Sequence, residues 1–364
     1  MLPSDEAGQW ILLPGQTPQG KPILSVLLKR SYRIVSEQPC QRLDKDRKLI
    51  SGDVHYGDPM NSSVQFESDF VPWKLATDIV FNATAYAPQG KATQQFMASL
   101  MVGELRKDLL ITGQRTAQYQ KNSPPLFSDP ELITQLALRY EDAYGGVDIY
   151  SDLNTPCAYA RNPLGKGFVI ENTKQAIEKL PLPLIENPND LLSPDCLLTE
   201  HFMHWQNQPM PAGIAWFPKT WQPRASYAGI MPADRETEQR LRTAYTKAVP
   251  KAQQKLYQQT QLPDMDFRFF SGASSDLALP YLHGDEIIKM RHLTPDGRLT
   301  FQLPNEHPQV SLNIGQGVET PNSVLQTVMI RMDDLEVDLV WRAAIHYEGI
   351  DWLPKMKTME LIIQ

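Results

Sequence analysis

Residues Gly52–Lys91 read GDVHYGDPMNSSVQFESDFVPWKLATDIVFNATAYAPQGK, and our interpretation of the chain starts from this stretch. Its first part is dense in acids, aromatics and turn residues. It then passes into a strand-like run, Asp78–Tyr86, which ends at the turn Pro88–Gly90. The first part allows two interpretations: the polar mouth of an active site, or a hydrogen-bonded loop that braces a β-sheet. The residues that an active site would use are Asp53, His55, Asp58, Glu67 and Asp69.

The bracing interpretation is favoured, because these five residues match no known spacing of metal ligands or acid–base groups. Buried carboxylates must be paired with cations. We therefore expect Asx-type turns in the loop and an ion pair of Lys74 with either Asp69 or Asp78. The residues predicted to be structural are Asp53, His55, Asp58, Asp69, Lys74 and Asp78, together with Trp341 and Arg342 near the C-terminus.

Strand patterns surround this stretch on both sides. Ile23–Val35 alternates between two faces, which predicts a half-buried strand with Ser25, Lys29, Ser31 and Arg33 on its polar face. Three further strand pairs are predicted, each joined by a polar turn: Phe96–Val102 with Leu109–Gly113 around Glu104–Asp108, Ile287–Leu293 with Arg298–Leu303, and Leu325–Met332 with Leu335–Arg342. In the last of these strands Leu335, Val337, Leu339 and Trp341 are expected to face inward, and Glu336, Asp338 and Arg342 outward. Leu136–Asp142 is ambiguous between helix and strand.

Composition agrees with a β-rich fold. The 364 residues are 41% hydrophobic and include 30 prolines, which cannot donate to a β-ladder and so favour short strands and ordered loops. We predict antiparallel sheets packed as a sandwich or a barrel-like body. The whole chain, 1–364, is expected to form one unit, with the β-rich body at about 20–145 and 265–345 and a Pro-rich elaboration at about 146–264.

Charge and cysteine content bear on the class of partner and the compartment. The formal net charge of -7 leaves no basic face of the kind that nucleic-acid binding needs. Three widely spaced cysteines suggest a reducing compartment and no disulfide framework. No signal peptide is apparent, and the apolar runs are far shorter than the roughly 18–20 residues of a membrane helix. We therefore expect a cytoplasmic protein without membrane insertion.

The central region combines prolines, tryptophans and the one convincing helical pattern. Asp234–Thr260 carries a thin apolar stripe with helical spacing, and Pro250 predicts a kink in it. Tryptophan and arginine dominate protein-binding hot spots, although the same pairs also seal β-cores by stacking. For Trp221 and Arg224 the two roles remain open. The residues predicted to contact a partner are Trp205, Trp216, Trp221, Arg224, Leu241 and Tyr245.

Motifs for catalysis, metals and cofactors are weak. His201 and His204 have the spacing of zinc ligands on one helical face, but neither an HExxH motif nor a cysteine pair accompanies them. Gly165–Gly167 lacks the spacing of a phosphate-binding loop and indicates a turn. No GxSxG motif occurs, and no cysteine lies in a nucleophile motif. The sequence thus predicts no catalytic, cofactor-binding or metal site.

Seven blocks in order resemble the bacterial family DUF2169 from about residue 23 to 345. Besides Gly52–Lys91 they are RNPLGKGF, LPLIENP, PAGIAWFPKTWQPR, LPDMDFRFF, YLHGDEIIKMRHLTPDGRLTFQLP and LQTVMIRMDDLEVDLVWRA. The chain departs from the family pattern in its longer Asp234–Thr260 segment and in Gln326, where an aspartate is usual. The resemblance implies an adaptor or chaperone of type VI secretion, without enzymatic activity or cofactor. Such a protein loads an effector, often one with a PAAR domain, onto the secretion spike.

Three functional hypotheses follow. The first is a cytoplasmic adaptor-chaperone that binds an effector, with the spike protein as a second partner, through an apolar groove or an exposed strand edge along residues 200–260. The second is a hydrolase with an acidic site in Gly52–Asp69. The third is a structural component of the secretion apparatus. An adaptor predicts a one-to-one complex with its client, whereas an apparatus component predicts self-assembly.

Overall fold

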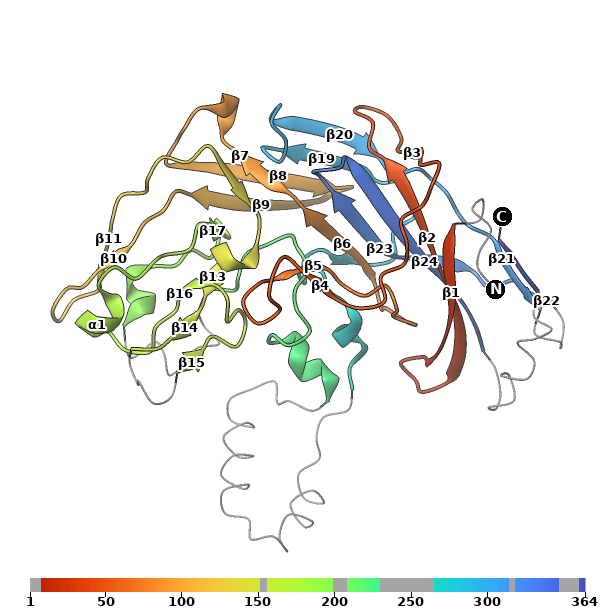
Figure 1. The fold of residues 1–364 in the computed structure, drawn as a ribbon, viewed down its shortest axis with the longest axis horizontal. Helices are drawn as coiled ribbons and strands as arrows, with labels where there is room; N and C mark the ends of the chain where they lie inside the picture. The colour runs from red at the N-terminus through yellow and green to blue at the C-terminus, as the bar shows by residue number, and fades with distance from the viewer. Residues whose placement is uncertain are drawn as a thin grey trace, which may run out of the picture.

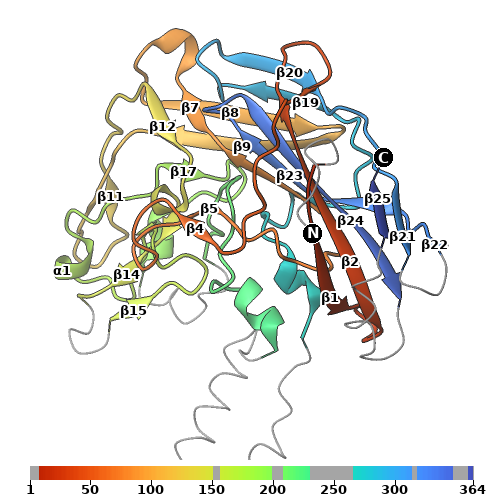
Figure 2. The same cartoon turned by 45° about the vertical axis from the view of Figure 1, so that its right-hand side comes forward.

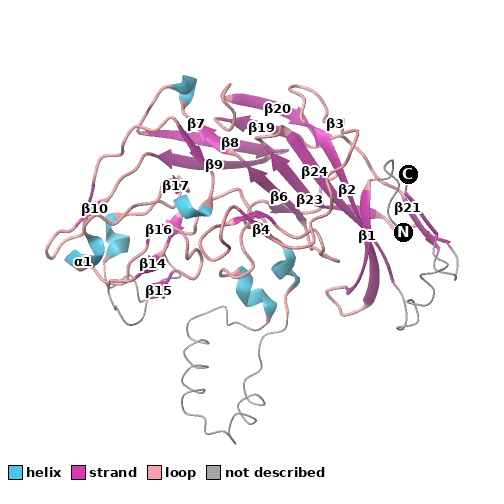
Figure 3. Cartoon of the chain, viewed as in Figure 1, coloured by secondary structure: helices cyan, strands magenta, loops and turns pink. Residues whose placement is uncertain are grey.

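A computed structural model of the chain describes residues 8–150, 156–198, 208–229, 265–313, 318–346 and 360–363. Strands dominate these residues, and helices are short (Figure 3). The α-helix among them is α1 (Lys174–Ile177), a single turn in which the N–H of Ala176 donates to the Thr173 side chain as an N-cap. The mainly β prediction is confirmed. In the described residues, no helix has the length and apolar character needed to cross a bilayer.

Two sheets form the body (Figure 1). The larger sheet has the strand order β1 (Gln9–Gln16), β2 (Pro22–Arg33), β24 (Glu336–His346), β23 (Ser323–Arg331), β6 (Thr77–Asn82) and β18 (Ala278–Leu279), and β3 (Gln41–Arg42) pairs with β2. The second sheet has the order β17 (Ile185–Glu186), β9 (Leu105–Thr112), β8 (Gln95–Val102), β19 (Ile287–Arg291) and β20 (Arg298–Gln302). All neighbours in the two sheets are antiparallel except β6 and β23, which are parallel.

The main core lies between these sheets and gives the body its sandwich character. It contains Ile79 and Phe81 of β6 and Leu339 of β24 on one side, and Leu100 of β8 and Ile288 of β19 on the other, all 2% exposed or less. Burying a side chain of this size stabilises the fold by about 1.5–3 kcal/mol. Residues of the central region enter the same core: Ile185, Ile214 and Trp216.

Smaller elements flank the body (Figures 1 and 2). A three-stranded sheet, β22 (Val318–Glu319), β21 (Val310–Asn313) and β25 (Glu360–Ile363), packs its Val310 and Leu312 against Leu24 and Val26 of β2. Five two-stranded pairs complete the described strands: β4 (Val54–His55) with β5 (Val64–Phe66), β7 (Thr84–Tyr86) with β12 (Gln135–Ala137), β10 (Ala117–Gln118) with β11 (Leu126–Phe127), β13 (Tyr144–Gly145) with β16 (Lys166–Gly167), and β14 (Val147–Asp148) with β15 (Cys157–Ala158). A second core around Tyr144, Tyr159 and Phe168 lies among the last of these pairs.

The strand predicted to be half-buried is buried on both faces. Every residue of β2 from Ile23 to Tyr32 is buried, including Lys29 at 2% exposure. Asp338 and Arg342 of β24, predicted to face outward, are also buried, at 0% and 4% exposure. The prediction was wrong because period-two alternation separates two faces but does not show that a loop covers the polar one.

The three predicted strand pairs are present, with different limits. β8 and β9 are joined by Gly103 and Glu104 alone, and Gly103 has a φ of 57°. Glu104–Asp108 is therefore not the turn, because Leu105 to Asp108 belong to the ladder. Phe301 in β20 and Leu303 just after it are buried, whereas Leu299 is only partly buried. Leu335 was expected to face inward, but it lies in the β23–β24 turn and is 45% exposed.

Two sequence patterns raised the question of a helix: Leu136–Asp142, which was ambiguous between helix and strand, and Asp234–Thr260, which was predicted to be helical. Leu136–Asp142 forms the end of β12 followed by a 3-10 turn, Tyr140–Asp142, so neither single interpretation covers it. The predicted helical segment Asp234–Thr260 lies outside the described residues.

Candidate functional site

The part of the Gly52–Lys91 stretch that precedes β6 covers the face of the large sheet on which Ser25, Lys29 and Asn82 lie. The Ser25 hydroxyl of β2 donates to the carbonyl oxygen of Pro72 at 2.8 Å. The Lys29 ammonium binds Asp69 at 2.8 Å, and the Asn82 amide donates to the carbonyl oxygen of Gln65 at 3.0 Å. These bonds run from buried strand positions to the covering loop, so the bracing interpretation agrees with the structure.

Asp338 lies at the centre of the polar layer between sheet and loop. Its carboxylate accepts hydrogen bonds from the Ser31 hydroxyl at 2.6 Å and from the Arg331 guanidinium at 2.7 Å, and it lies 3.8 Å from the Lys29 ammonium. The Asp338 side chain has no exposed area. A carboxylate removed from water needs such partners, because the desolvation cost of an unpaired buried ion is several kcal/mol.

Lys74 pairs with Asp78, which decides between the two predicted partners. The Lys74 Nζ lies 2.6 Å from Asp78 Oδ2 and donates to the Thr327 hydroxyl at 3.0 Å. The same ammonium lies 5.3 Å from the ring centre of Trp216. Asp69 is instead the partner of Lys29. Lys74 thus joins the loop to β6 and β23 at one buried point.

Glu67 forms a bidentate ion pair with Arg224. The two distances are 2.6 and 2.7 Å, and both side chains are 3% exposed. Burial acts to raise the pKa of Glu67, but the charge and hydrogen bonds of Arg224, with Lys219 and Lys74 nearby, bring that pKa below its ordinary value. Glu67 is therefore an ionised structural carboxylate.

The three remaining residues of the five that an active site would use stabilise the loop itself. Asp58 accepts the N–H of Met60 at 2.8 Å, which confirms an Asx turn there. His55 Nδ1 lies 2.9 Å from the Ser62 carbonyl oxygen. Asp53 accepts the N–H of Ser68 and pairs with Lys219, which also reaches Glu67. Among the described residues no group of three His, Cys, Asp or Glu side chains has the arrangement of a metal site.

The tryptophan and arginine residues singled out from the sequence are mostly buried. Trp216 and Trp221 are each 4% exposed, and Trp221 packs edge-to-face on Tyr140 and Phe217. Trp341 is 3% exposed in the main core. Arg342 stacks over Trp73, with its guanidinium carbon 3.6 Å from the ring centre. The predicted partner-binding role of Trp216, Trp221 and Arg224 stays a prediction, and in the structure these side chains make internal contacts.

Five residues of the sequence-based site predictions are not placed by the structure. Trp205, Leu241 and Tyr245, predicted to contact a partner, lie outside the described residues. The same holds for His201 and His204.

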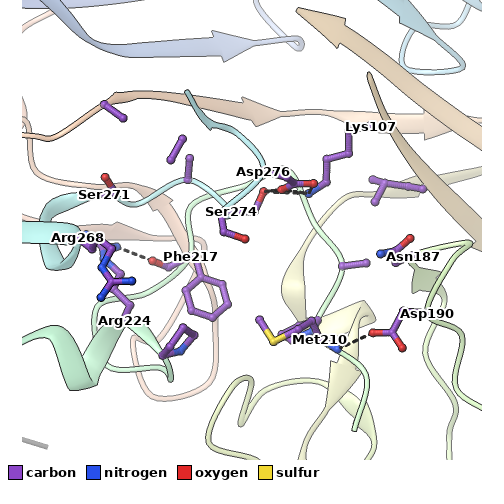
Figure 4. A pocket seen from close by; sticks show the side chains of 18 of the residues that line it. Lys107, Asn187, Asp190, Met210, Phe217, Arg224, Arg268, Ser271, Ser274 and Asp276 are labelled. Atoms are coloured by element: carbon purple, nitrogen blue, oxygen red, sulfur yellow. Dashed lines mark hydrogen bonds and ion pairs between the residues drawn. The ribbon is translucent and has the colours of Figure 1, made fainter. Parts of the chain in front are cut away.

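A cavity of about 720 Å³ lies where five parts of the chain meet (Figure 4), and Leu75 and Ala76, just before β6, form one of them. One wall is the first half of β9, and the turn after β17, Asn187–Asp190, stands beside it. The other walls come from residues 210–227 and 271–278, the first of which falls inside the predicted binding region 200–260. Phe217 and Met210 project into the space between Asp190 on one side and Arg224 and Arg268 on the other (Figure 4).

The cations around this cavity are paired, whereas Asp190 accepts the N–H of Met210 at 3.2 Å. The Lys107 ammonium binds Asp276 at 2.7 Å and the Ser274 hydroxyl at 2.9 Å. Burial lowers the pKa of Lys107, an effect that the charge of Asp276 opposes. Arg268 is held by Asp266 at 2.6 Å. The cavity thus combines paired charges at its wall with apolar side chains and backbone groups.

Sequence reasoning did not find this cavity. Lys107 was assigned to a polar turn, and Asp276 follows two serines in a loop without a recognisable motif. The two residues are 169 positions apart, and only long-range contacts bring them together. The sequence contains only an indirect indication of the cavity, which is the concentration of prolines and aromatic residues in residues 210–227.

The fold and the cavity define a β-sandwich protein with a cavity beside the first half of β9. Residues 19–342 match the model of a family described as "Uncharacterized protein conserved in bacteria (DUF2169)". The chain belongs to this family, because the match covers well over half of its length. Neither a curated protein nor a solved structure gave a match.

Proposed function

We propose that this protein is a cytoplasmic adaptor-chaperone that binds a type VI secretion effector, one with a PAAR domain, and assists its loading onto the secretion spike. The assignment to type VI secretion comes from the resemblance of its sequence blocks to adaptors of the DUF2169 family. Its mechanism is reversible capture of an aggregation-prone segment of the effector until the spike assembles, without a cofactor.

The observation that carries the proposal is the cavity of about 720 Å³. This volume falls in the range of about 300–1,000 Å³ typical of binding pockets. Apolar side chains such as Phe217 and Met210 line it, and Met210 is 40% exposed. The charges of Lys107 and Arg268 at its rim are neutralised by Asp276 and Asp266, and apolar or backbone contacts supply the recognition.

The hydrolase hypothesis loses support from the arrangement of its proposed acids. Glu67 and Asp69 are bound to cations at the buried face of the loop, and Asp58 stabilises a turn. General acid–base catalysis needs a carboxylate within reach of a substrate proton. No observation favours an apparatus component over an adaptor, and self-assembly would be its signature.

The test is co-expression with the effector encoded beside this protein, followed by size-exclusion chromatography with light scattering. We expect a stoichiometric one-to-one complex, and we expect the effector to be insoluble when expressed alone. A soluble effector that forms no complex would overturn the proposal and direct attention to a hydrolysis screen. Higher-order assembly of this protein alone would favour an apparatus component.

A further inference from the structure

The outer edge of β9 is paired over only part of its length. The neighbouring strand β17 pairs at two positions, Ile185 with Ile111 and Glu186 with Leu110. The chain then turns away through Asn187–Asp190. Among the described residues, no strand lies beside Leu105–Leu109 on this edge, and Arg106 to Leu109 line the cavity.

The hydrogen-bond register of β9 shows which of its backbone groups point away from β8 and toward the cavity. The Thr112 N–H donates to Leu184, on the side of β17, at 2.9 Å. In an antiparallel strand the direction of the backbone groups alternates with every residue. Leu110, Asp108 and Arg106 therefore point the same way as Thr112, and Lys107 and Leu109 point toward β8. The N–H and C=O groups of Arg106 and Asp108 thus face the cavity, and within the described parts of the chain no backbone bond to them is recorded.

The cavity lies directly beyond the end of β17, beside this open edge of β9. β17 pairs with β9 as an antiparallel strand up to Glu186, and its straight continuation would run past Leu109 toward Arg106. The turn Asn187–Asp190 and residues 271–278 both line the cavity (Figure 4). Ala212, Phe217 and Ala273 offer an apolar lining of small and aromatic side chains on the inner side.

We propose that the Arg106–Leu109 edge of β9 is the docking site for an extended segment of the effector, which extends the five-stranded sheet in line with β17. The inference rests on the proposed function, since it identifies where and how the client binds. The segment pairs with the backbone groups of Arg106 and Asp108. Its alternate side chains are apolar and enter the cavity, and those between them are polar and face solvent.

Proline at position 108 tests the pairing directly. Because the Asp108 N–H points away from β8, Asp108→Pro removes a donor from the open edge and leaves the β8–β9 ladder intact, as proline at a strand edge does. The matched control is Asp108→Ala, which removes the same carboxylate and its bond to Arg106 but keeps the N–H. Affinity for the effector encoded beside this protein is measured by calorimetry for the wild type and both variants.

We expect Asp108→Pro to weaken effector binding at least about tenfold and Asp108→Ala to bind within about twofold of the wild type. Equal affinity of all three proteins would overturn the strand-docking inference while leaving the adaptor function in place. A wild type that binds no effector would overturn the adaptor function itself.

Hydrogen–deuterium exchange on the wild-type chain gives a second readout that does not depend on the folding of a variant. The amides of Arg106 and Asp108 should exchange rapidly in the free protein and become protected in the complex. Protection elsewhere but not here would overturn the inference. Slow exchange in the free protein would also overturn it, because the edge would then already be paired.

Discussion

Arg224 and Glu67 are 157 positions apart in the sequence and form two hydrogen bonds of 2.7 and 2.6 Å with each other in a site where each is 3% exposed. The pair connects the covering loop to the segment that also lines the cavity. Arg224 further donates to the carbonyl oxygens of Phe217 and Phe269. The Arg224 guanidinium thus holds the segments around Phe217 and Phe269 against the covering loop.

Arg224→Ala should destabilise the protein by about 3–5 kcal/mol, because it leaves the buried carboxylate of Glu67 without its main partner. The matched control is Arg268→Ala. Arg268 also pairs with an aspartate, but it is 59% exposed, so we expect at most about 1 kcal/mol. Urea unfolding measures both. Similar losses for the two variants would contradict a buried structural role for Arg224.

The Glu67–Arg224 pair predicts a dependence of stability on pH. The folded-state pKa of Glu67 lies below its ordinary value of 4.5. The contribution of ionised Glu67 to the free energy of unfolding is therefore fully present at pH values above 4.5. It is lost as the pH falls through the folded-state pKa. The difference in free energy of unfolding between the wild type and Glu67→Gln should be largest near about pH 7 and shrink toward about pH 3. A difference that does not change with pH would show that Glu67 is not ionised in the fold.

Lys74→Ala should lower the melting temperature by several degrees, because it leaves the buried Asp78 without its cation. Part of the effect comes from the lost bond to Thr327, which links the loop to β23. Lys289→Ala, at an exposed strand position, is the control and should change stability by about 0.5 kcal/mol or less. An unchanged melting temperature in Lys74→Ala would contradict the bracing role.

Cys40 should be the least reactive of the placed thiols. It is 6% exposed, and burial raises its pKa to about 12, so almost none of it is thiolate at neutral pH. Labelling with a thiol-specific reagent, followed by peptide mapping, should modify Cys157 and Cys196 before Cys40. Rapid native-state labelling of Cys40 would show that the segment around it opens.

Deletion of residues 234–260 tests the binding region predicted from the sequence. The N–H of Asp266 donates to the carbonyl oxygen of Tyr227 at 2.8 Å, so a short glycine–serine linker can join the flanking residues. We expect a folded protein with weaker effector binding, because the predicted contacts Leu241 and Tyr245 are removed. Unchanged binding by the folded variant would exclude this segment from the contact surface.

The burial of polar residues in β2 and β24 shows what an alternating sequence pattern can and cannot predict. The pattern in Ile23–Val35 identified the strand, and the pattern around Leu339 identified the closing hairpin. Both patterns misplaced the polar residues Lys29 and Asp338, because a polar face is exposed only when nothing covers it. The Gly52–Lys91 stretch was recognised as a bracing loop, but the strand residues that it braces were not identified.

The sequence by itself determined the main strands and hairpins and predicted a bracing role for the acidic stretch, because these depend on local periodicity and turn residues. Only the tertiary structure decided the ion partners and the cavity. Lys29 with Asp69, Glu67 with Arg224, and Lys107 with Asp276 are pairs between distant segments, and the choice among many available cations depends on which chains pack together. The open edge of β9 is decided in the same way, because it depends on where β17 ends.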